Sequence, residues 1–374
     1  MENDPLESIA SNRYTIAGVP EIFSVIQSLS SFRKWKGLPS GICFYGWSQY
    51  SRNIQLHGFA GACATLGIPF YVIYKERAKD ILSCLKNVHN LIVITYIQFL
   101  PELESFIKRA KCHIVLMWQY YDDTPDPLLA TPIGSKEKEI LKGFRKDIHL
   151  VLSELSLEGN QRFMSGYVRD FGIPVMTFPW AVNIDRHFPV CAAIDKDVFF
   201  IGTYCEKAAR IEEYFGKVLR RYAHTVIGPD WSRSTLRWME DSIMQADEFH
   251  TRAPLLYSSH TVSLNIHLPF EASGYSCNER VFNAIACGGF EVCDNAGRVK
   301  DFFDETELVT GSSPEEYFER VSYFIENPEK RTAYMVKALK KIYRHHTYHH
   351  RLADLLHQFF TGKPLSEFCR VMMN

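Results

Sequence analysis

One stretch in the second half of the chain, residues 263–295, limits the fold most. It reads SLNIHLPFEASGYSCNERVFNAIACGGFEVCDN. The apolar run that ends at Ile266 predicts a buried strand, and a loop of small and polar residues follows it. Ser276, with Glu279 three positions later, predicts the N-cap and capping box of a helix, which the Gly288-Gly289 pair ends before a second buried strand. This order of strand, loop, helix and strand indicates a parallel α/β sheet.

The loop in this stretch suits an anion. Gly274 and Ser276 precede the predicted helix, where backbone N–H groups and the positive end of the helix dipole face a ligand. In open α/β sheets, ligands bind outside the carboxyl ends of the strands. The stretch therefore predicts a phosphate-binding site.

The same alternation of strands and helices runs through the rest of the chain. Strands are predicted at residues 42–45, 70–74, 91–96, 113–118, 150–153, 175–178, 198–201 and 225–227, with helical patterns between most of them. Such alternation favours parallel sheets covered by helices on both faces, and 374 residues suffice for two domains. We expect an N-terminal domain over residues 1–180, a linker over 181–196 and a C-terminal domain over 197–360, with 361–374 packing back on the first domain.

Composition excludes several classes of protein. The chain is 46% hydrophobic and 23% charged, as ordinary globular proteins are. Its net charge of -1 provides no overall basic field for nucleic acid or an anionic membrane. No apolar run reaches the roughly 20 residues that a membrane span needs. The ten cysteines form no CxxC pair and no secretion signal is visible, so we expect a cytoplasmic protein.

Several short segments carry a resemblance to a known family. They are NERVFNAIACGG (278–289), PWAVN (179–183), FFIGT (199–203) with Arg210, LNIH (264–267), and HTY (346–348) with Arg351. In this order they resemble the CgeB-like, or spore-maturation-protein, glycosyltransferases. The resemblance covers the second half of the chain, and it implies the GT-B fold, in which two Rossmann-like βαβ domains face a central cleft.

The resemblance also implies an activity. Such an enzyme moves a hexosyl or pentosyl group from a UDP- or GDP-sugar to a hydroxyl acceptor, with the nucleotide sugar bound by the C-terminal domain and no metal or cofactor required. The acceptor class stays open between a glycan, a protein and modified DNA. Retaining GT-B enzymes often carry two glutamates eight residues apart, and Glu271 and Glu279 have this spacing. Retention of the anomeric configuration is therefore expected.

Candidate donor-binding residues follow from the same segments. Arg280 matches an arginine of the family and suits a diphosphate because its planar guanidinium binds two oxygens at once. Gly202 allows a ligand to approach the backbone, and Lys207 and Arg210 are the cations expected near the pyrophosphate. The alternatives are a surface ion pair for Arg280 and a solvated position for Lys207.

The position that usually holds a ribose-binding glutamate falls on Asn283. An amide still donates and accepts hydrogen bonds with ribose hydroxyls, although it carries no charge. Glu279, one helical turn earlier, either assists Asn283 or only caps the helix, and Asn278 belongs to the same segment.

Candidate catalytic residues are Glu271, Asp122 and His57. Glu271 is the first glutamate of the spaced pair. Asp122 follows a predicted strand and is a candidate for activating the acceptor hydroxyl, although the run DDTPD (122–126) is also typical of a turn. His57 is a candidate acceptor-side base, against a purely structural role. The histidines of residues 345–350 lack further ligands at suitable spacing, so no metal site is predicted.

Two other functions stay open. One is a glycosyltransferase that modifies hydroxymethylated DNA bases, for which the basic runs 33–36 and 217–221 would line a groove and the neutral net charge is unfavourable. The other is a non-catalytic binding protein of the same fold, which the asparagine at position 283 favours.

Overall fold

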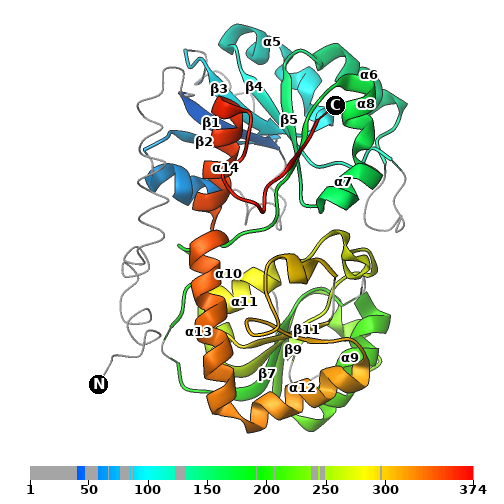
Figure 1. Cartoon of the computed structure of the whole chain (residues 1–374), viewed down its shortest axis with the longest axis vertical. Coiled ribbons are helices and arrows are strands. Elements are labelled where there is room, and N and C mark those ends of the chain that lie inside the picture. Colours follow the sequence, from blue (N-terminus) through cyan, green and yellow to red (C-terminus); the bar gives the residue numbers. More distant parts are fainter. Residues whose placement is uncertain are drawn as a thin grey trace. The chain divides into compact units, whose positions relative to one another are not determined.

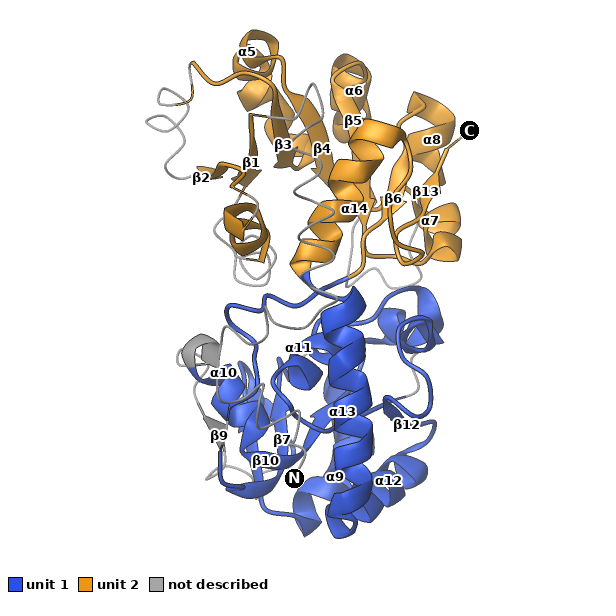
Figure 2. Ribbon diagram, turned by 60° about the vertical axis from the view of Figure 1, so that its left-hand side comes forward, with its two compact units in different colours: residues 1–23, 180–347 blue, residues 24–179, 348–374 orange. Residues whose placement is uncertain are grey.

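The structure is a computed structural model. It describes residues 40–46, 58–65, 67–75, 85, 87–122, 132–190, 192–204, 207–236, 243–244, 249–294 and 297–373. Of these, 180–347 form one compact unit, called unit 1, and 40–179 together with 348–373 form unit 2 (Figure 2). The basic run 33–36 and the candidate base His57 lie outside the described residues.

Unit 2 is built on a seven-stranded sheet in the order β13-β6-β5-β4-β3-β1-β2. Its strands are β1 (Gly41–Gly46), β2 (Phe70–Tyr74), β3 (Leu91–Thr95), β4 (His113–Met117), β5 (Ile148–Ser153), β6 (Val175–Thr177) and β13 (Val371–Met372). The pairs are parallel except β13 with β6. Continuous apolar strands such as β3, all buried, are what a parallel sheet covered on both faces requires. The helices of unit 2 include α5 (Leu100–Ala110), α6 (Ser135–Phe144), α7 (Leu157–Phe163), α8 (Ser165–Phe171) and α14 (Tyr348–Thr361), with the 3-10 turn η3 (Ile97–Phe99).

Unit 1 contains a six-stranded parallel sheet in the order β12-β11-β10-β7-β8-β9 (Figure 1). The strands are β7 (Lys196–Ile201), β8 (His224–Ile227), β9 (Ile243–Met244), β10 (His260–Asn265), β11 (Glu291–Asp294) and β12 (Val309–Gly311). If these six strands are numbered 1 to 6 along the chain and read from the β9 edge, their order is 3-2-1-4-5-6, which is the Rossmann order. The direction in which successive strands are added to the sheet reverses between β7 and β10. Ligands of such sheets bind at the carboxyl ends of the two strands beside this reversal.

Helices of unit 1 cover this sheet with apolar stripes. They are α9 (Ala208–Arg221), α10 (Phe249–Ser258), α11 (Arg280–Ala286), α12 (Pro314–Glu326) and α13 (Pro328–His345), with short turns η5 (Trp231–Arg233), η8 (Glu271–Tyr275) and η9 (Gly297–Asp301). In α9, Ile211, Phe215 and Val218 recur at the spacing of one helical face and are buried in the same core as Phe200 of β7. The periodic apolar pattern thereby fixes α9 next to the end of β7.

The predicted fold class, two α/β domains with parallel sheets, is confirmed. The domain ends differ from the expected ones in two places. Residues 181–196, expected to be a linker, belong to unit 1, where Val182 forms an isolated β-bridge with Thr347. Unit 1 ends at Thr347 and not at residue 360. The final helix α14 belongs to unit 2, because the ring of its Tyr348 packs on Phe59 and its buried Arg351 donates to the Pro179 carbonyl at 2.9 Å. Among the described residues, no helix is long and apolar enough to cross a membrane.

Alanine substitutions at two glycines of unit 1, one at the end of β12 and one inside α9, should change the stability of unit 1 in opposite directions. A Cβ on Gly311 would lie 2.6 Å from the backbone of Tyr317, whereas a Cβ on Gly216 in α9 would meet nothing within 4 Å. Gly311→Ala should therefore destabilise unit 1 by about 1–3 kcal/mol through overpacking. Gly216→Ala should stabilise it by about 0.5–1 kcal/mol, because a helix interior favours alanine.

Denaturant unfolding of the two variants and the parent measures both effects. Equal unfolding midpoints for Gly311→Ala and the parent would contradict the close packing of β12 on α12.

Candidate functional site

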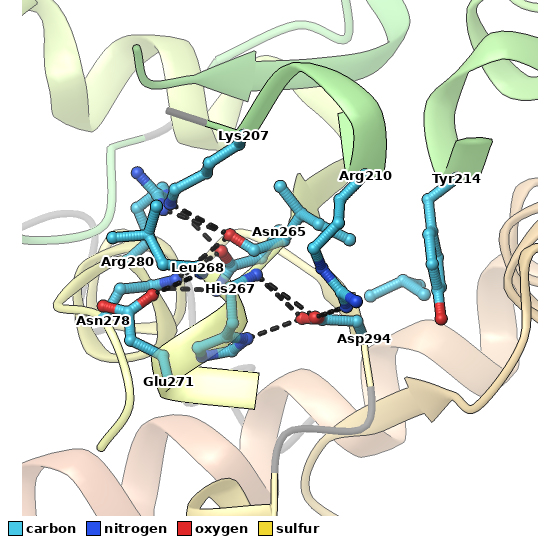
Figure 3. A network of polar contacts seen from close by, with 12 residues as sticks. Lys207, Arg210, Tyr214, Asn265, His267, Leu268, Glu271, Asn278, Arg280 and Asp294 are labelled. Atoms are coloured by element: carbon cyan, nitrogen blue, oxygen red, sulfur yellow. Dashed lines mark hydrogen bonds and ion pairs between the residues drawn. The ribbon is translucent and has the colours of Figure 1, made fainter. Parts of the chain in front are cut away.

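Arg280 occupies the point where the strand order of unit 1 reverses. Its Nε donates to Asn265 Oδ1 at 3.1 Å, its Nη1 to the Ile201 carbonyl at 3.2 Å and its Nη2 to the Ile266 carbonyl at 3.3 Å (Figure 3). Ile201 ends β7, and Ile266 directly follows β10. The guanidinium is thus fixed across the two central strands at their carboxyl ends, and its hydrogen-bond acceptors among the described residues are neutral oxygen atoms.

The residues around Arg280 leave room for this position. Its guanidinium carbon lies 5.5 Å from the centre of the Phe200 ring, a favourable cation–π distance. A Cβ on Gly202 would lie 2.9 Å from Arg280 Nη1, and the φ of Gly202 is +156°. A side chain at position 202 would therefore displace the guanidinium, which accounts for the glycine.

A second cation approaches the same point. Lys207 is buried, with 7% of its surface exposed, and its Nζ donates to the Ile266 carbonyl at 3.1 Å. Burial, followed by repulsion from Arg280, lowers the pKa of Lys207 to about 8. Because this ammonium forms no ion pair with a described carboxylate, an anion at the site would stabilise it.

Asp294 at the end of β11 ties the surrounding elements together. It accepts hydrogen bonds from the backbone N–H of His267 at 3.1 Å, from His267 Nδ1 at 2.6 Å and from Arg210 of α9 at 2.6 Å. Burial alone would raise the pKa of Asp294, but His267 and Arg210 hold it below its usual value. Arg210, expected near the pyrophosphate, therefore has its charge paired within the protein.

The N-cap predicted at Ser276 for the helix within residues 263–295 was wrong. The helix α11 begins at Arg280, and Glu279 takes the N-cap position without a side-chain cap bond. Ser276 has an extended backbone with φ -142° and is buried, and its hydroxyl donates to the neighbouring Cys277 carbonyl at 3.5 Å. The physical reason is competition, since Asn278 is held by Asn265 through two amide hydrogen bonds of 3.0 Å and the chain cannot turn helical before it.

The segment before Asn278 forms a local turn instead. Glu271 Oε2 accepts the backbone N–H of Leu268 at 2.7 Å, so one oxygen of this candidate catalytic carboxylate stabilises the turn η8. Gly274 has φ +98°, and a Cβ on Gly297 would lie only 3.1 Å from its Cα. Glycine at position 274 thus permits the backbone angle, and glycine at position 297 permits the close contact between η9 and η8.

Asn283 on α11 is 4% exposed, and its Oδ1 has no hydrogen-bond partner among the described residues. A buried amide oxygen without a partner is costly unless a ligand satisfies it. The ribose-binding role of Asn283 stays a prediction.

Asp122 lies in unit 2, where it accepts the Ser165 hydroxyl at 3.1 Å and has Arg169 at 3.9 Å. These contacts agree with the turn alternative, in which Asp122 is structural. The described residues contain no group of three or more His, Cys, Asp or Glu side chains that could hold a metal ion.

Sequence reasoning missed three residues of this site, namely Asn265, Asp294 and Glu291. Each is a buried polar residue within or at the end of an apolar strand. Polar residues are rare there, and that rarity is the signal that would have found them.

Comparison with known proteins identifies the fold. Residues 208–357, less than half of the chain, match the family model described as glycosyl transferase-like. Among curated proteins, no sequence relative matches the chain. The solved structures that are similar to the chain include glycosyltransferases, among them the beta-glucosyltransferase of T4 phage. The chain has the GT-B fold.

Three of these structures illustrate the likeness. TarM of S. aureus, solved with UDP and alpha-GlcNAc-glycerol, is 11% identical with a TM-score of 0.54, over 75% of this chain and 58% of TarM. HepE of Anabaena, in complex with UDP and glucose, is 10% identical with a TM-score of 0.59, over 86% and 100%. BGT of T4 phage, in complex with UDP-glucose, is 12% identical with a TM-score of 0.52, over 81% and 94%. The chain thus spans less than three fifths of TarM, and at these identities the likeness shows the fold alone.

The cluster around Asp294 predicts a large stability effect. Asp294→Asn removes a buried charge that two cationic or polar partners share, so it should lower the free energy of unfolding by about 3 kcal/mol. The exposed pair of Lys217 and Glu315, 3.5 Å apart, supplies the control, because Glu315→Gln should change it by less than about 0.5 kcal/mol.

The pH dependence of the unfolding free energy tests whether ionised Asp294 stabilises the folded state. Since the folded pKa of Asp294 is depressed, its contribution is present above the unfolded value of about 3.9 and disappears as the pH falls through the folded pKa. The Asp294→Asn variant should lose less stability in acid than the parent does. An unfolding free energy for this variant equal to that of the parent at neutral pH would rule out the role given to Asp294.

Proposed function

We propose that the protein is a nucleotide-sugar-dependent glycosyltransferase of the CgeB-like group that binds its donor at the carboxyl ends of β7 and β10 in unit 1. One observation carries the proposal: Arg280 is fixed at the reversal of strand order and forms no ion pair with a described residue. Its positive charge therefore remains available to a diphosphate. Buried Lys207, which shares the Ile266 carbonyl with Arg280, adds a second charge.

This arrangement addresses the main electrostatic difficulty of glycosyl transfer. As the bond between the sugar and the diphosphate breaks, negative charge develops on the leaving phosphate oxygens. Cations that are already oriented in a partly buried site stabilise this charge without reorganisation, and more strongly than they would in water. Arg280 and Lys207 supply this stabilisation, and Asn283 receives the ribose hydroxyls through its unpartnered oxygen.

The acceptor of the proposed reaction is a hydroxyl group. Retention follows from the spacing of Glu271 and Glu279, and the donor phosphate itself assists deprotonation of the acceptor, so that no strong protein base is needed. UDP-sugars are the first donors to test, because the solved structures with this fold bind UDP, UDP-glucose or UDP with a sugar.

The first test of the proposal is donor hydrolysis and binding. Arg280→Lys keeps the charge but lacks the planar guanidinium that donates to several oxygen atoms at once. It should therefore weaken UDP-glucose or UDP-GlcNAc binding at least about tenfold. Arg320→Lys on α12, whose guanidinium is exposed in a pair with Glu316, is the matched control and should bind as the parent does. Isothermal calorimetry and UDP release measure the two effects.

The outcomes separate the open functions. Binding without UDP release, with or without glycan, protein or hydroxymethylated DNA acceptors, would favour the non-catalytic binding protein. Transfer to DNA alone would favour the DNA-modifying enzyme. Equal binding by Arg280→Lys and the parent would place the donor elsewhere.

The depressed pKa of Lys207 predicts a pH dependence of donor binding. Lys207 carries its charge below about pH 8 and loses it above, so its loss of charge should lower donor affinity as the pH rises past about 8. Lys207→Arg keeps its charge throughout this range, and its affinity should not fall there.

Calorimetric titrations of the parent and Lys207→Arg with the same nucleotide sugar, at a series of pH values, test this. A parallel decline in both proteins above about pH 8 would show that Lys207 does not face the donor.

A further inference from the structure

Asn265 is the residue on which the position of Arg280 depends. It ends β10, is fully buried, and all four hydrogen-bonding positions of its amide are used. Oδ1 accepts Arg280 Nε at 3.1 Å and Asn278 Nδ2 at 3.0 Å, while Nδ2 donates to Asn278 Oδ1 and to Glu291 Oε1, each at 3.0 Å.

These partners leave the amide a single orientation. Arg280 Nε is only a donor, so it must face the oxygen of Asn265. The amide nitrogen is then directed at Glu291, whose oxygen accepts whether the carboxyl group is ionised or protonated. The backbone of Asn265 is also held, because its N–H donates to the hydroxyl of Tyr317 at 3.2 Å.

We propose that Asn265 is a positioning residue that holds Arg280 toward the donor diphosphate with a neutral oxygen, and that buried Glu291 behind it tunes the charge that the donor meets. The proposal rests on the function proposed above. A carboxylate at position 265 would bind the guanidinium in the same place, but it would neutralise the charge that the diphosphate needs. The amide provides the geometry without this neutralisation.

Glu291 extends the argument to charge. Burial raises its pKa to about 7, against the hydrogen bond from Asn265 and the attraction of His267 and Arg280, while Asp294 raises it further. Glu291 is therefore neutral in mild acid and negative above neutrality. Because it lies one amide away from Arg280, its ionisation reduces the positive potential at the site.

The test compares Asn265→Asp with the parent, and uses UDP-glucose and UDP-GlcNAc as probes. Both phosphates of these sugars are esterified and have no proton to lose near neutral pH, so only the protein titrates. Asn265→Asp should raise the dissociation constant at least about tenfold. Asn327→Asp, at the junction of α12 and α13, adds the same charge elsewhere in unit 1 and should change it less than about twofold.

A second variant separates positioning from simple damage to the fold. Glu291→Gln keeps an oxygen acceptor for Asn265 but cannot ionise. Between about pH 6 and about pH 7.5 the parent's affinity should fall several-fold, whereas that of Glu291→Gln should stay constant. Lys207 stays mostly protonated over this range, since its pKa is about 8.

Thermal unfolding of each variant accompanies the binding measurements, and the Glu291→Gln comparison stands even where Asn265→Asp does not fold. Tight binding by Asn265→Asp, or the same pH profile for Glu291→Gln and the parent, would overturn the positioning role while leaving the proposed function in place. Failure of the parent to bind either sugar would overturn both.

Discussion

The hydrogen bonds of one guanidinium to three neutral oxygens govern the architecture of unit 1 around its site. A charged side chain taken from water costs several kcal/mol unless its donors are satisfied. Arg280 meets this requirement with the ends of β7 and β10 and with Asn265. The nearby Gly202 and the ring of Phe200 then follow as consequences, because both leave the space that the guanidinium occupies.

The stability of this region comes from groups one step away from the cations. Asp294 joins α9 to the residue after β10 through Arg210 and His267, and the hydroxyl of Tyr317 donates to the Val292 carbonyl at 2.8 Å. These contacts connect β11 to α9, to α12 and to the residues that follow β10. Lys207, in contrast, stays buried with a depressed pKa, a local cost of the kind that functional sites carry when the surrounding fold compensates for it.

Sequence patterns were sufficient for the sheets and insufficient for the polar details. Apolar runs such as 290–293 predicted β7, β8, β10 and β11 to within two residues, because burial on both faces of a parallel sheet demands them, whereas the short strands β9 and β12 were not predicted. The helix start was wrong, since Ser276 fits a capping box locally but Asn278 pairs with Asn265, which is distant in sequence. Likewise, the amphipathic pattern of α14 shows that one face is buried but not which unit buries it. The roles of Asn265 and Glu291 depend on such long-range pairing.

Neutral amides are found at two positions of α11 and β10 near Arg280. The side chain bonded directly to Arg280 is an amide, and the buried group expected at the ribose, Asn283, is an amide as well. The carboxylates contact other groups: Glu291 accepts a hydrogen bond from Asn265, and Asp294 is bound to His267 and Arg210. Opposite charges in direct contact would give a more stable apo protein with less attraction for an anion. Separating them by one neutral group keeps the fold paired while the positive potential remains directed at the carboxyl ends of β7 and β10. An asparagine where a glutamate is usual is therefore compatible with a binding site selected for a polyanionic donor.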